Sequence, residues 1–490
     1  MSGQISDFEN VTLEKGIKEN TALIKGIFKN DAILRTRNVK VGKNKTSAVL
    51  FYFDGMVNSE IINDSIVRPL VTFGGTVESI QEIESNILFS NEVSQKTVLS
   101  DILTSVIYGD TVLLLDDDST ALVINTKGFR TRGISEPGEE RVLQGPREGF
   151  DEAAMFNMAM IRRKLITPDL NVEMLRIGRR TKTLVFICYL GSLADRNTLR
   201  NLKLNLRKID VDGILDSNYI AEMINKNKFT CFKSVGTTEK PDVVAARLLE
   251  GRIAIVVDGT PVVLTLPYLF SENFQSDEDY YLHFTIASIN RFLRYICFFV
   301  AVAAPAVYVA LITFHINLLP TSFMMSVMNL RSGVPMSSVV ECIILILVFE
   351  ILKEAGIRAS QSMGFAVSIV GGLVVGQSSV EAGIISAPML IIVALSGVCG
   401  LVIPRLRGAI FYFRIISVVL ASLFGLYGVI TIFCLMLIRI LSLKNFGTEY
   451  TASLSNPKFA FLKDTFIRTD WKNMILRPIF NKNLVRKGKK

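Results

Sequence analysis

The chain has few of the side chains on which most enzyme sites depend. Its 490 residues include two histidines, His283 and His315, and neither has a carboxylate or a cysteine at a metal-ligand spacing. No C-x-x-C pair is present, and the phosphate-binding patterns G-x-x-x-x-G-K-[ST] and G-x-G-x-x-G are absent as well. The acidic run 116–118 lacks the further oxygen ligands of a calcium loop. We therefore expect no enzymatic activity, no metal and no cofactor.

An export signal is also missing from the N-terminus. Residues 1–44 are polar and rich in lysine, with no apolar core of the kind that a signal peptide needs. The six cysteines form no disulfide pattern, and four of them lie in apolar runs, where a free thiol packs as a small hydrophobic group. We expect residues 1–294 to stay in the cytoplasm, held there by Arg291 and Arg294 in front of the first apolar run.

The second half of the chain has long stretches without charge. Between Arg294 and Arg331, 36 residues pass without one Asp, Glu, Lys or Arg. About 20 apolar residues in a helix are enough to cross a bilayer. The candidate spans are 295–319, 336–352, 361–380, 384–403 and 415–438. Because 336–352 is the shortest, we favour four crossings plus one partial element within a transmembrane helical domain at 291–443.

Charge is distributed unevenly along the sequence. Residues 1–294 carry 36 basic and 38 acidic side chains, whereas 295–443 carry 11 charges in 149 positions. The tail, 444–490, has 11 basic and 3 acidic residues. Trp471, Phe461 and Phe480 interleave with the tail's charges, as on a helix at a membrane surface. We therefore expect this basic tail to face the anionic cytoplasmic leaflet and to contact membrane lipids, not nucleic acid.

The first half is typical of an α/β protein. Residues 1–45 are predicted to be a flexible polar arm with one helix, and 46–290 a cytoplasmic α/β domain. Strands are predicted at 48–53 and 183–189, hairpins at 111–126 and 252–267, and helices at 151–165, 197–208 and 216–227. Two subdomains would divide near 133–145. The common shape of the two hairpins is a weak indication that the subdomains are duplicates.

Carboxylates and small residues in the apolar half are the candidates for a functional site. A carboxylate inside a membrane is costly and is a functional hypothesis by default. Small residues near position 372 have a G-x-x-x-G spacing, which indicates helix contact more often than a water-filled path. The candidates for an ion pathway are Ser368, Val370, Gly371, Gly372, Val374, Gly376, Gln377, Glu341 and Glu381. Glu350 is either a further candidate or, with Lys353, Glu354 and Arg358, part of a paired helix end facing water.

A set of ordered motifs resembles one known family. The motifs are 144–150 (QGPREGF), 161–163 (IRR), 178–180 (GRR), 238–242 (TEKPD), 249–252 (LEGR), 258–261 (DGTP), 279–281 (DYY), 349–358 (FEILKEAGIR), 368–371 (SIVG), 376–377 (GQ), 380–383 (VEAG) and 425–428 (GLYG). From about residue 50 to 447 the chain resembles the A subunit of spore germinant receptors of the GerA type. Lys240 replaces the family's usual arginine, and Ala359-Ser360 replaces Leu-Pro.

The resemblance implies a function that the residues alone do not give. It implies a multi-pass protein of the spore inner membrane that works with a permease-like B subunit and a lipoprotein C subunit. It also implies a homo-oligomer of A subunits that forms a ligand-gated ion channel and triggers germination. The alternatives are a sporulation membrane protein of the stage V AF type, aiding ion or dipicolinate release, and a secondary transporter. A transporter would need inverted repeats with broken helices in matching positions, which the sequence does not show.

Overall fold

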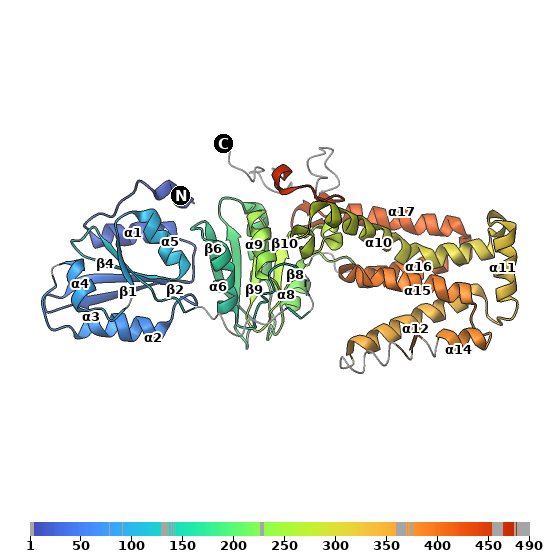
Figure 1. Cartoon of the computed structure of the whole chain (residues 1–490), viewed down its shortest axis with the longest axis horizontal. Coiled ribbons are helices and arrows are strands. Elements are labelled where there is room, and N and C mark those ends of the chain that lie inside the picture. Colours follow the sequence, from blue (N-terminus) through green and yellow to red (C-terminus); the bar gives the residue numbers. More distant parts are fainter. Residues whose placement is uncertain are drawn as a thin grey trace.

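The molecule is elongated, and two α/β units and a helical bundle follow one another along its long axis (Figure 1). This computed structural model describes residues 4–452 except 78, 91, 129–136, 139, 141, 143, 226–229, 359–368, 370 and 373–375, together with 464–474 and 477. The predicted change from an α/β first half to a helical second half is confirmed.

The first unit is a five-stranded antiparallel sheet in the order β1-β2-β4-β5-β3. Its strands are β1 (Leu34–Val41), β2 (Thr46–Phe53), β3 (Val93–Lys96), β4 (Thr111–Leu115) and β5 (Ala121–Ile124). Its helices are α1 (Ile17–Ile27), α2 (Ser59–Ile61), α3 (Arg68–Thr72), α4 (Ile80–Asn86) and α5 (Leu99–Tyr108). The predicted 111–126 hairpin is confirmed as β4 and β5.

The second unit repeats the topology of the first. Its strands pair antiparallel in the order β6-β7-β9-β10-β8, which is the strand order of the first unit with each strand number raised by five. They are β6 (Leu170–Ile177), β7 (Thr183–Leu190), β8 (Gly236–Thr238), β9 (Ile253–Val257) and β10 (Val263–Leu266). The helices are α6 (Ala154–Lys164), α7 (Arg196–Arg207), α8 (Ser217–Ile224) and α9 (Pro241–Leu249). The two predicted hairpins occupy equivalent places, so they do mark two units of one topology.

Both faces of each sheet are buried, because apolar side chains alternate between two hydrophobic cores. In β4, Val112 and Leu114 join one cluster, while Leu113 and Leu115 join the other. The first of these clusters continues into the second unit, where it includes Phe186 of β7. The two units are therefore packed against each other through apolar side chains.

A buried ion pair joins the two α/β units. The Arg162 guanidinium of α6 contacts the Asp31 carboxylate of the first unit, and both side chains are shielded from solvent. Arg162 also lies over the Phe53 ring, 4.0 Å from its centroid. Burial raises the pKa of Asp31, against the opposing effect of Arg162. Because removing one partner of such a pair leaves an uncompensated charge, the pair fixes how the units meet.

The arm expected at residues 1–45 has more structure than the sequence indicated. Residues 17–27 form α1, and 34–41 form β1, which pairs with β2 over eight residues from Leu34 opposite Phe53 to Val41 opposite Thr46. In β1, charged and apolar side chains alternate, as is typical of an edge strand with one wet face. The high charge of this strand hid the alternation from the sequence analysis. The first unit therefore begins well before residue 46.

The bundle consists of one long helix and the helices packed around it. They are α10 (Phe284–Thr313), α11 (Thr321–Arg331), α12 (Ser338–Arg358), α14 (Gly376–Glu381), α15 (Ala387–Leu401), α16 (Arg407–Phe424) and α17 (Leu426–Ser442). In Figure 1, α10, α15, α16 and α17 run along the long axis, and α11 lies at the end far from the α/β units. Two stretches, Phe284–Thr313 and Pro404–Phe424, are long and apolar enough to cross a membrane.

The single span predicted at 415–438 is wrong. The chain breaks there at Gly425, whose φ of 59° and ψ of −140° are accessible to glycine and strained for other residues. The helices α16 and α17 then pack against each other as a hairpin. Gly428 makes the tight turn possible, since a Cβ atom at this position would lie 2.1 Å from the Leu420 carbonyl oxygen. The 425–428 motif therefore contains the turn at Gly425 and the first residues of α17.

We expect residues 1–280 to fold when produced alone. The cores on the two sheets are built almost entirely from side chains within these residues, and about 280 residues are ample to bury a core. Circular dichroism should show mixed helix and strand with a cooperative thermal transition. A random-coil spectrum would contradict this expectation.

Candidate functional site at the junction of the two halves

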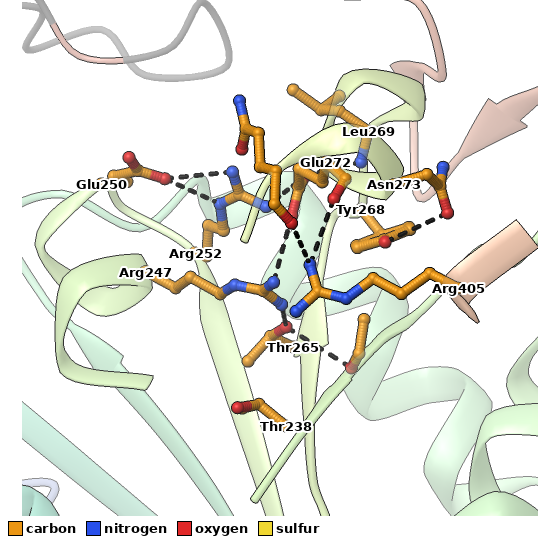
Figure 2. Close-up of polar contacts among 12 residues, drawn as sticks. Thr238, Arg247, Glu250, Arg252, Thr265, Tyr268, Leu269, Glu272, Asn273 and Arg405 are labelled. Atoms are coloured by element: carbon orange, nitrogen blue, oxygen red, sulfur yellow. Dashed lines mark hydrogen bonds and ion pairs between the residues drawn. The ribbon is translucent and has the colours of Figure 1, made fainter. Parts of the chain in front are cut away.

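The α/β half and the bundle meet around one buried carboxylate, that of Glu272. It lies in a short helix, η3 (Phe270–Phe274), and is 3% exposed. One carboxylate oxygen accepts from Arg252 Nη1 at 2.6 Å and from the Leu269 backbone N–H at 2.7 Å. The other oxygen lies 3.5 Å from Arg247 Nη2. Figure 2 shows these arginines pointing toward Glu272 from the α/β side.

Arg405 enters the same cluster from the bundle. It lies in the turn η7 (Pro404–Leu406) between α15 and α16. Its Nη1 donates to the backbone carbonyls of Glu272 and Gln275, each at 3.1 Å (Figure 2). Its Nη2 pairs with Glu140 at 3.2 Å and approaches Asp277 at 3.7 Å. The tip of the α15–α16 hairpin is therefore fastened to the α/β half by one guanidinium.

Glu140 extends this contact to the 238–242 motif. Its second carboxylate oxygen accepts from Thr238 Oγ1 at 2.6 Å and from the Glu239 backbone N–H at 3.0 Å. Further along the motif, the Tyr281 hydroxyl donates to the Asp242 carboxylate. Burial and this carboxylate together raise the pKa of Tyr281, so the hydroxyl stays protonated and remains a donor. Motifs that lie far apart in the sequence thus meet at one place.

A second set of charges holds the base of α10. Asp279 is fully buried and accepts from Arg291 Nε at 3.2 Å and from Arg294 Nη1 at 2.8 Å. Both arginines were expected to act as cytoplasmic charges in front of a span. In the structure they are paired with this carboxylate, so their charge also anchors the helix.

One described part of the tail, residues 464–474, lies across this base, and we call it the strap. Asp464 accepts from Arg291 Nη1 and from the Tyr280 hydroxyl, both at 3.0 Å. Arg468 Nη1 donates to the Leu282 carbonyl at 3.1 Å, and the Arg468 backbone exchanges hydrogen bonds with the Ser288 hydroxyl. The strap therefore ties the C-terminal region to the start of α10. Trp471 is half-exposed on the strap, while Phe461 and Phe480 lie outside the described residues.

The junction is suited to transmitting motion. Burial disfavours the Arg252 cation, but the Glu272 and Glu250 carboxylates outweigh this and hold the pKa of Arg252 above its ordinary value. A buried charge that loses its partner costs several kcal/mol, on the order of 3–5. If the two halves move relative to each other, the charged side chains of the junction therefore either move together or lose their partners at a high cost in free energy.

The predicted ion-pathway residues that the structure describes lie away from this junction. Glu341 is fully buried near the start of α12 and accepts from the Ser386 backbone N–H at 2.7 Å and its hydroxyl at 2.6 Å. Arg331, at the end of α11, lies 3.5 Å from the Glu341 carboxylate. The Glu341 carboxylate thus holds together the ends of three helices.

The other predicted residues are found in different surroundings. Gly371 is buried against Leu352, Gly376 is buried beside Leu390, and Gly372 has open space around it. Gln377 donates to the Glu381 carboxylate at 2.8 Å, and both side chains are exposed. Ser368, Val370 and Val374 lie outside the described residues.

Glu350 belongs to a paired helix end, one of the two alternatives that the sequence left open. Its carboxylate pairs with Lys353, and Glu354 pairs with Arg358 at 2.7 Å. Arg407, at the start of α16, lies 2.9 Å from Glu354 and 3.8 Å from Glu350. These pairs bring the end of α12 close to the junction end of α16.

Comparison with known proteins gives the family. The model of the "Bacillus/Clostridium GerA spore germination protein" family matches residues 22–480. The chain belongs to the GerA family. It is 37% identical to spore germination protein KA of Bacillus subtilis over 98% of this chain and 89% of that protein. It is equally 37% identical to the uncharacterized membrane protein YfkQ of B. subtilis, over 97% and 93%. Spore germination protein GerLA of Bacillus cereus is 33% identical, over 89% of each chain.

One solved structure is also similar. It is the N-terminal domain of the A subunit of the Bacillus megaterium spore germinant receptor GerK3, at 32% identity and a TM-score of 0.40. The match covers 53% of this GerA-family chain and 97% of that domain.

Sequence reasoning missed the junction residues of this GerA-family chain. It considered the carboxylates and the small residues of the apolar half, whereas Arg405, Arg407 and Arg414 are three arginines within ten residues between apolar helices. Charged residues between apolar helices are functional candidates whether they are acidic or basic, so these arginines could have been selected from the sequence. The partners Glu140, Glu272 and Asp464 gave no such signal, because their contacts with Arg405 or Arg291 cross more than a hundred residues of sequence.

The thiols offer a direct check of the fold. Cys188 is fully buried in β7, and burial raises the pKa of its thiol, so it is shielded and protonated. Cys231 is exposed. In folded protein we expect a water-soluble maleimide to label Cys231 and to leave Cys188 unmodified until denaturant is added. Labelling of Cys188 at the same rate as Cys231 would show that the second sheet is not packed in this way.

Proposed function

We propose that this chain is the A subunit of a nutrient germinant receptor and opens an ion path when nutrient binds its complex. Membership of the GerA family carries the proposal. Relatives named as spore germination proteins match most of the chain, and the similar crystal structure is from a germinant receptor A subunit. The partners would be a permease-like B subunit, which senses the nutrient, and a lipoprotein C subunit. The location would be the spore inner membrane.

The apolar surface of the bundle supports a multi-pass arrangement. Large apolar side chains are exposed along its helices, among them Phe292, Phe299, Leu395, Val419 and Leu437. Such a surface is unfavourable in water and suits lipid tails. With about 1.5 Å per residue, α10 is roughly 45 Å long, which exceeds a 30 Å hydrocarbon core and leaves its base for the junction.

The ends of the bundle support an even number of crossings. The chain enters the bundle at the junction, and after α17 the Asn445 side chain donates to the Tyr268 carbonyl at 3.1 Å, again at the junction. The strap returns to the same place. Both the α/β half and the tail would therefore lie on one side of the membrane, the cytoplasmic side, which the lysine-rich tail favours.

The ion path would run beside α14 in an oligomer of A subunits. Gly372, Gln377 and Glu381 are exposed in the single chain, so a neighbouring copy can cover them. Carboxylates at such a position attract cations. Nutrient binding to the complex would favour an open arrangement of the helices over a closed one. The junction would transmit this change between the α/β half and the bundle.

Release of ions from dormant spores tests the proposal. Spores with the chain should release monovalent cations when their nutrient is added, and spores lacking it should not respond to that nutrient. Reintroducing the chain should restore release. If release is unchanged without the chain, the receptor assignment is wrong. If only dipicolinate release is slowed, a role of the stage V AF type is favoured instead.

Bulky replacement along the predicted path should slow release. Gly372→Leu, and likewise substitutions at Val370 or Val374, should reduce the rate of nutrient-triggered release at unchanged protein level, because a narrow path has little spare volume. Gly408→Leu is the matched control, since Gly408 also has open space around it but lies at the junction end of α16. If the release rate of each variant simply follows its abundance, these residues pack helices and do not line a path.

A further inference from the structure

A proline in α10 leaves one backbone carbonyl of that helix without its usual donor. Pro305 lies inside the helix and has no N–H, so the Ala301 carbonyl four residues earlier receives no helical hydrogen bond. Two side chains from other helices take its place. Arg414 Nε and Ser396 Oγ each donate to the Ala301 carbonyl oxygen at 2.9 Å. The next carbonyl, that of Val302, accepts from Ser417 Oγ at 3.0 Å.

These donors are buried at the centre of the bundle. Arg414 is 3% exposed, and Ser396 and Ser417 are 0% exposed. Arg414 Nη2 also donates to the Ser396 carbonyl at 3.3 Å, so one guanidinium joins α10, α15 and α16. Among the residues that the structure describes, the hydrogen bonds of Arg414 go to backbone carbonyls and none goes to a carboxylate, and its Nη1 has no hydrogen-bond partner. A cation held at this depth without an acidic partner is costly, which indicates that its contacts with α10 matter.

Helices α15 and α16, which carry Ser396 and Arg414, also meet at the junction. Arg405, in the turn between α15 and α16, is fastened to the α/β half through Glu140 and the carbonyls of Glu272 and Gln275. Arg414 follows nine residues later, about 13 Å further along the helix axis. One hairpin therefore contacts the α/β half at its tip and the proline of α10 within the bundle.

We propose that Arg414 is a positioning residue that holds a proline hinge in α10, and that the α15–α16 hairpin links this hinge to the junction. Movement of the α/β half shifts the hairpin through Arg405, and Arg414 with Ser396 carries the shift to the freed Ala301 carbonyl. The α10 segment beyond Pro305 then changes its direction relative to the segment fixed at Asp279. This inference rests on the proposed receptor function and adds the residues by which the junction reaches the membrane helices.

A double-mutant cycle tests the hinge, because the Pro305→Ala substitution restores the missing N–H donor. Arg414→Met should slow nutrient-triggered cation release about tenfold at matched protein level in the Pro305 background. In the Pro305→Ala background the same substitution should slow release less than about threefold, because the helix itself now satisfies the Ala301 carbonyl. Arg439→Met, at an exposed arginine of α17, should have no such dependence on residue 305.

Ser396→Ala gives a milder variant in case Arg414→Met lowers abundance too far to be measured. It removes one donor to the same carbonyl and should slow release about threefold with Pro305 present and not at all in the Pro305→Ala background. Equal effects of these substitutions in the two backgrounds, or no effect in either, would overturn the hinge. Failure of the receptor proposal looks different, because the unsubstituted chain itself would then support no nutrient-triggered release.

Discussion

Glu272→Ala should destabilise the isolated α/β half by about 3–5 kcal/mol, since it leaves buried Arg247 without its carboxylate and buried Arg252 with Glu250 alone. Arg252 lies 2.6 Å and Arg247 3.5 Å from this side chain, and each of the three is less than a tenth exposed. Chemical unfolding of residues 1–280 with and without the substitution measures the change. Asp210→Ala is the control, because Asp210 pairs with Arg179 at the surface, where a pair contributes at most about 1 kcal/mol.

A loss of less than about 1 kcal/mol for Glu272→Ala would contradict the network. In the full chain the same substitution also removes one of the three acidic charges near Arg405, leaving Glu140 and Asp277. We therefore expect spores with Glu272→Ala to contain less of the protein and to show no response to their nutrient.

Removal of residues 464–490 should abolish nutrient-triggered release, because it takes the strap away from the base of α10. Arg291, which is fully buried, would lose Asp464, and Tyr280 would lose the carboxylate that accepts its hydroxyl. Arg291 would keep Asp279, so α10 should still form while its base is held less firmly. The rate of cation release at matched protein level is the measurement, and we expect a loss of at least about tenfold from a buried charge losing one of two partners.

Removal of residues 478–490 alone is the matched control for the strap. This truncation deletes much of the positive charge of the tail but leaves Asp464, Arg468 and Trp471 in place. It should leave release within about twofold of the full chain, since every hydrogen bond between the strap and the base of α10 remains. If the two truncations reduce release equally, the tail acts through its charge and the strap contacts are not important.

Local pattern was enough to predict six of the ten strands of the α/β half, but not β1, β3, β6 and β8. The hairpins at 111–126 and 252–267 each combine two apolar runs with an acidic turn, and the structure has both. Two of the features that were missed, one in each half of the chain, escaped for opposite reasons. The strand at 34–41 is too charged to look like a buried strand, and 415–438 is so uniformly apolar that the turn at Gly425 did not show. At 34–41 the position at the edge of the sheet, and at 415–438 the backbone conformation of one glycine, decided the structure, and average hydropathy showed neither.

The candidate site was harder to predict than the fold. Glu341, named as an ion-pathway candidate, is a buried carboxylate, and its partners Ser386 and Arg331 were not predicted. The junction depends on contacts such as Arg405 with Glu140 and Arg291 with Asp464, whose members are separated by 265 and 173 residues. Whether residues so far apart in the sequence form a pair is decided by tertiary packing, and the spacing rules for helices and strands do not predict it.

Ion flux through reconstituted membranes tests the central claim most directly. Purified chain would be incorporated into lipid vesicles with its B-type and C-type partners, and release of a trapped monovalent cation would be followed after addition of nutrient. We expect nutrient-dependent flux that requires this chain and that falls when Gly372→Leu or Arg414→Met is incorporated in equal amount. Vesicles that contain the complete complex and remain as impermeable as empty ones, with or without nutrient, would contradict it.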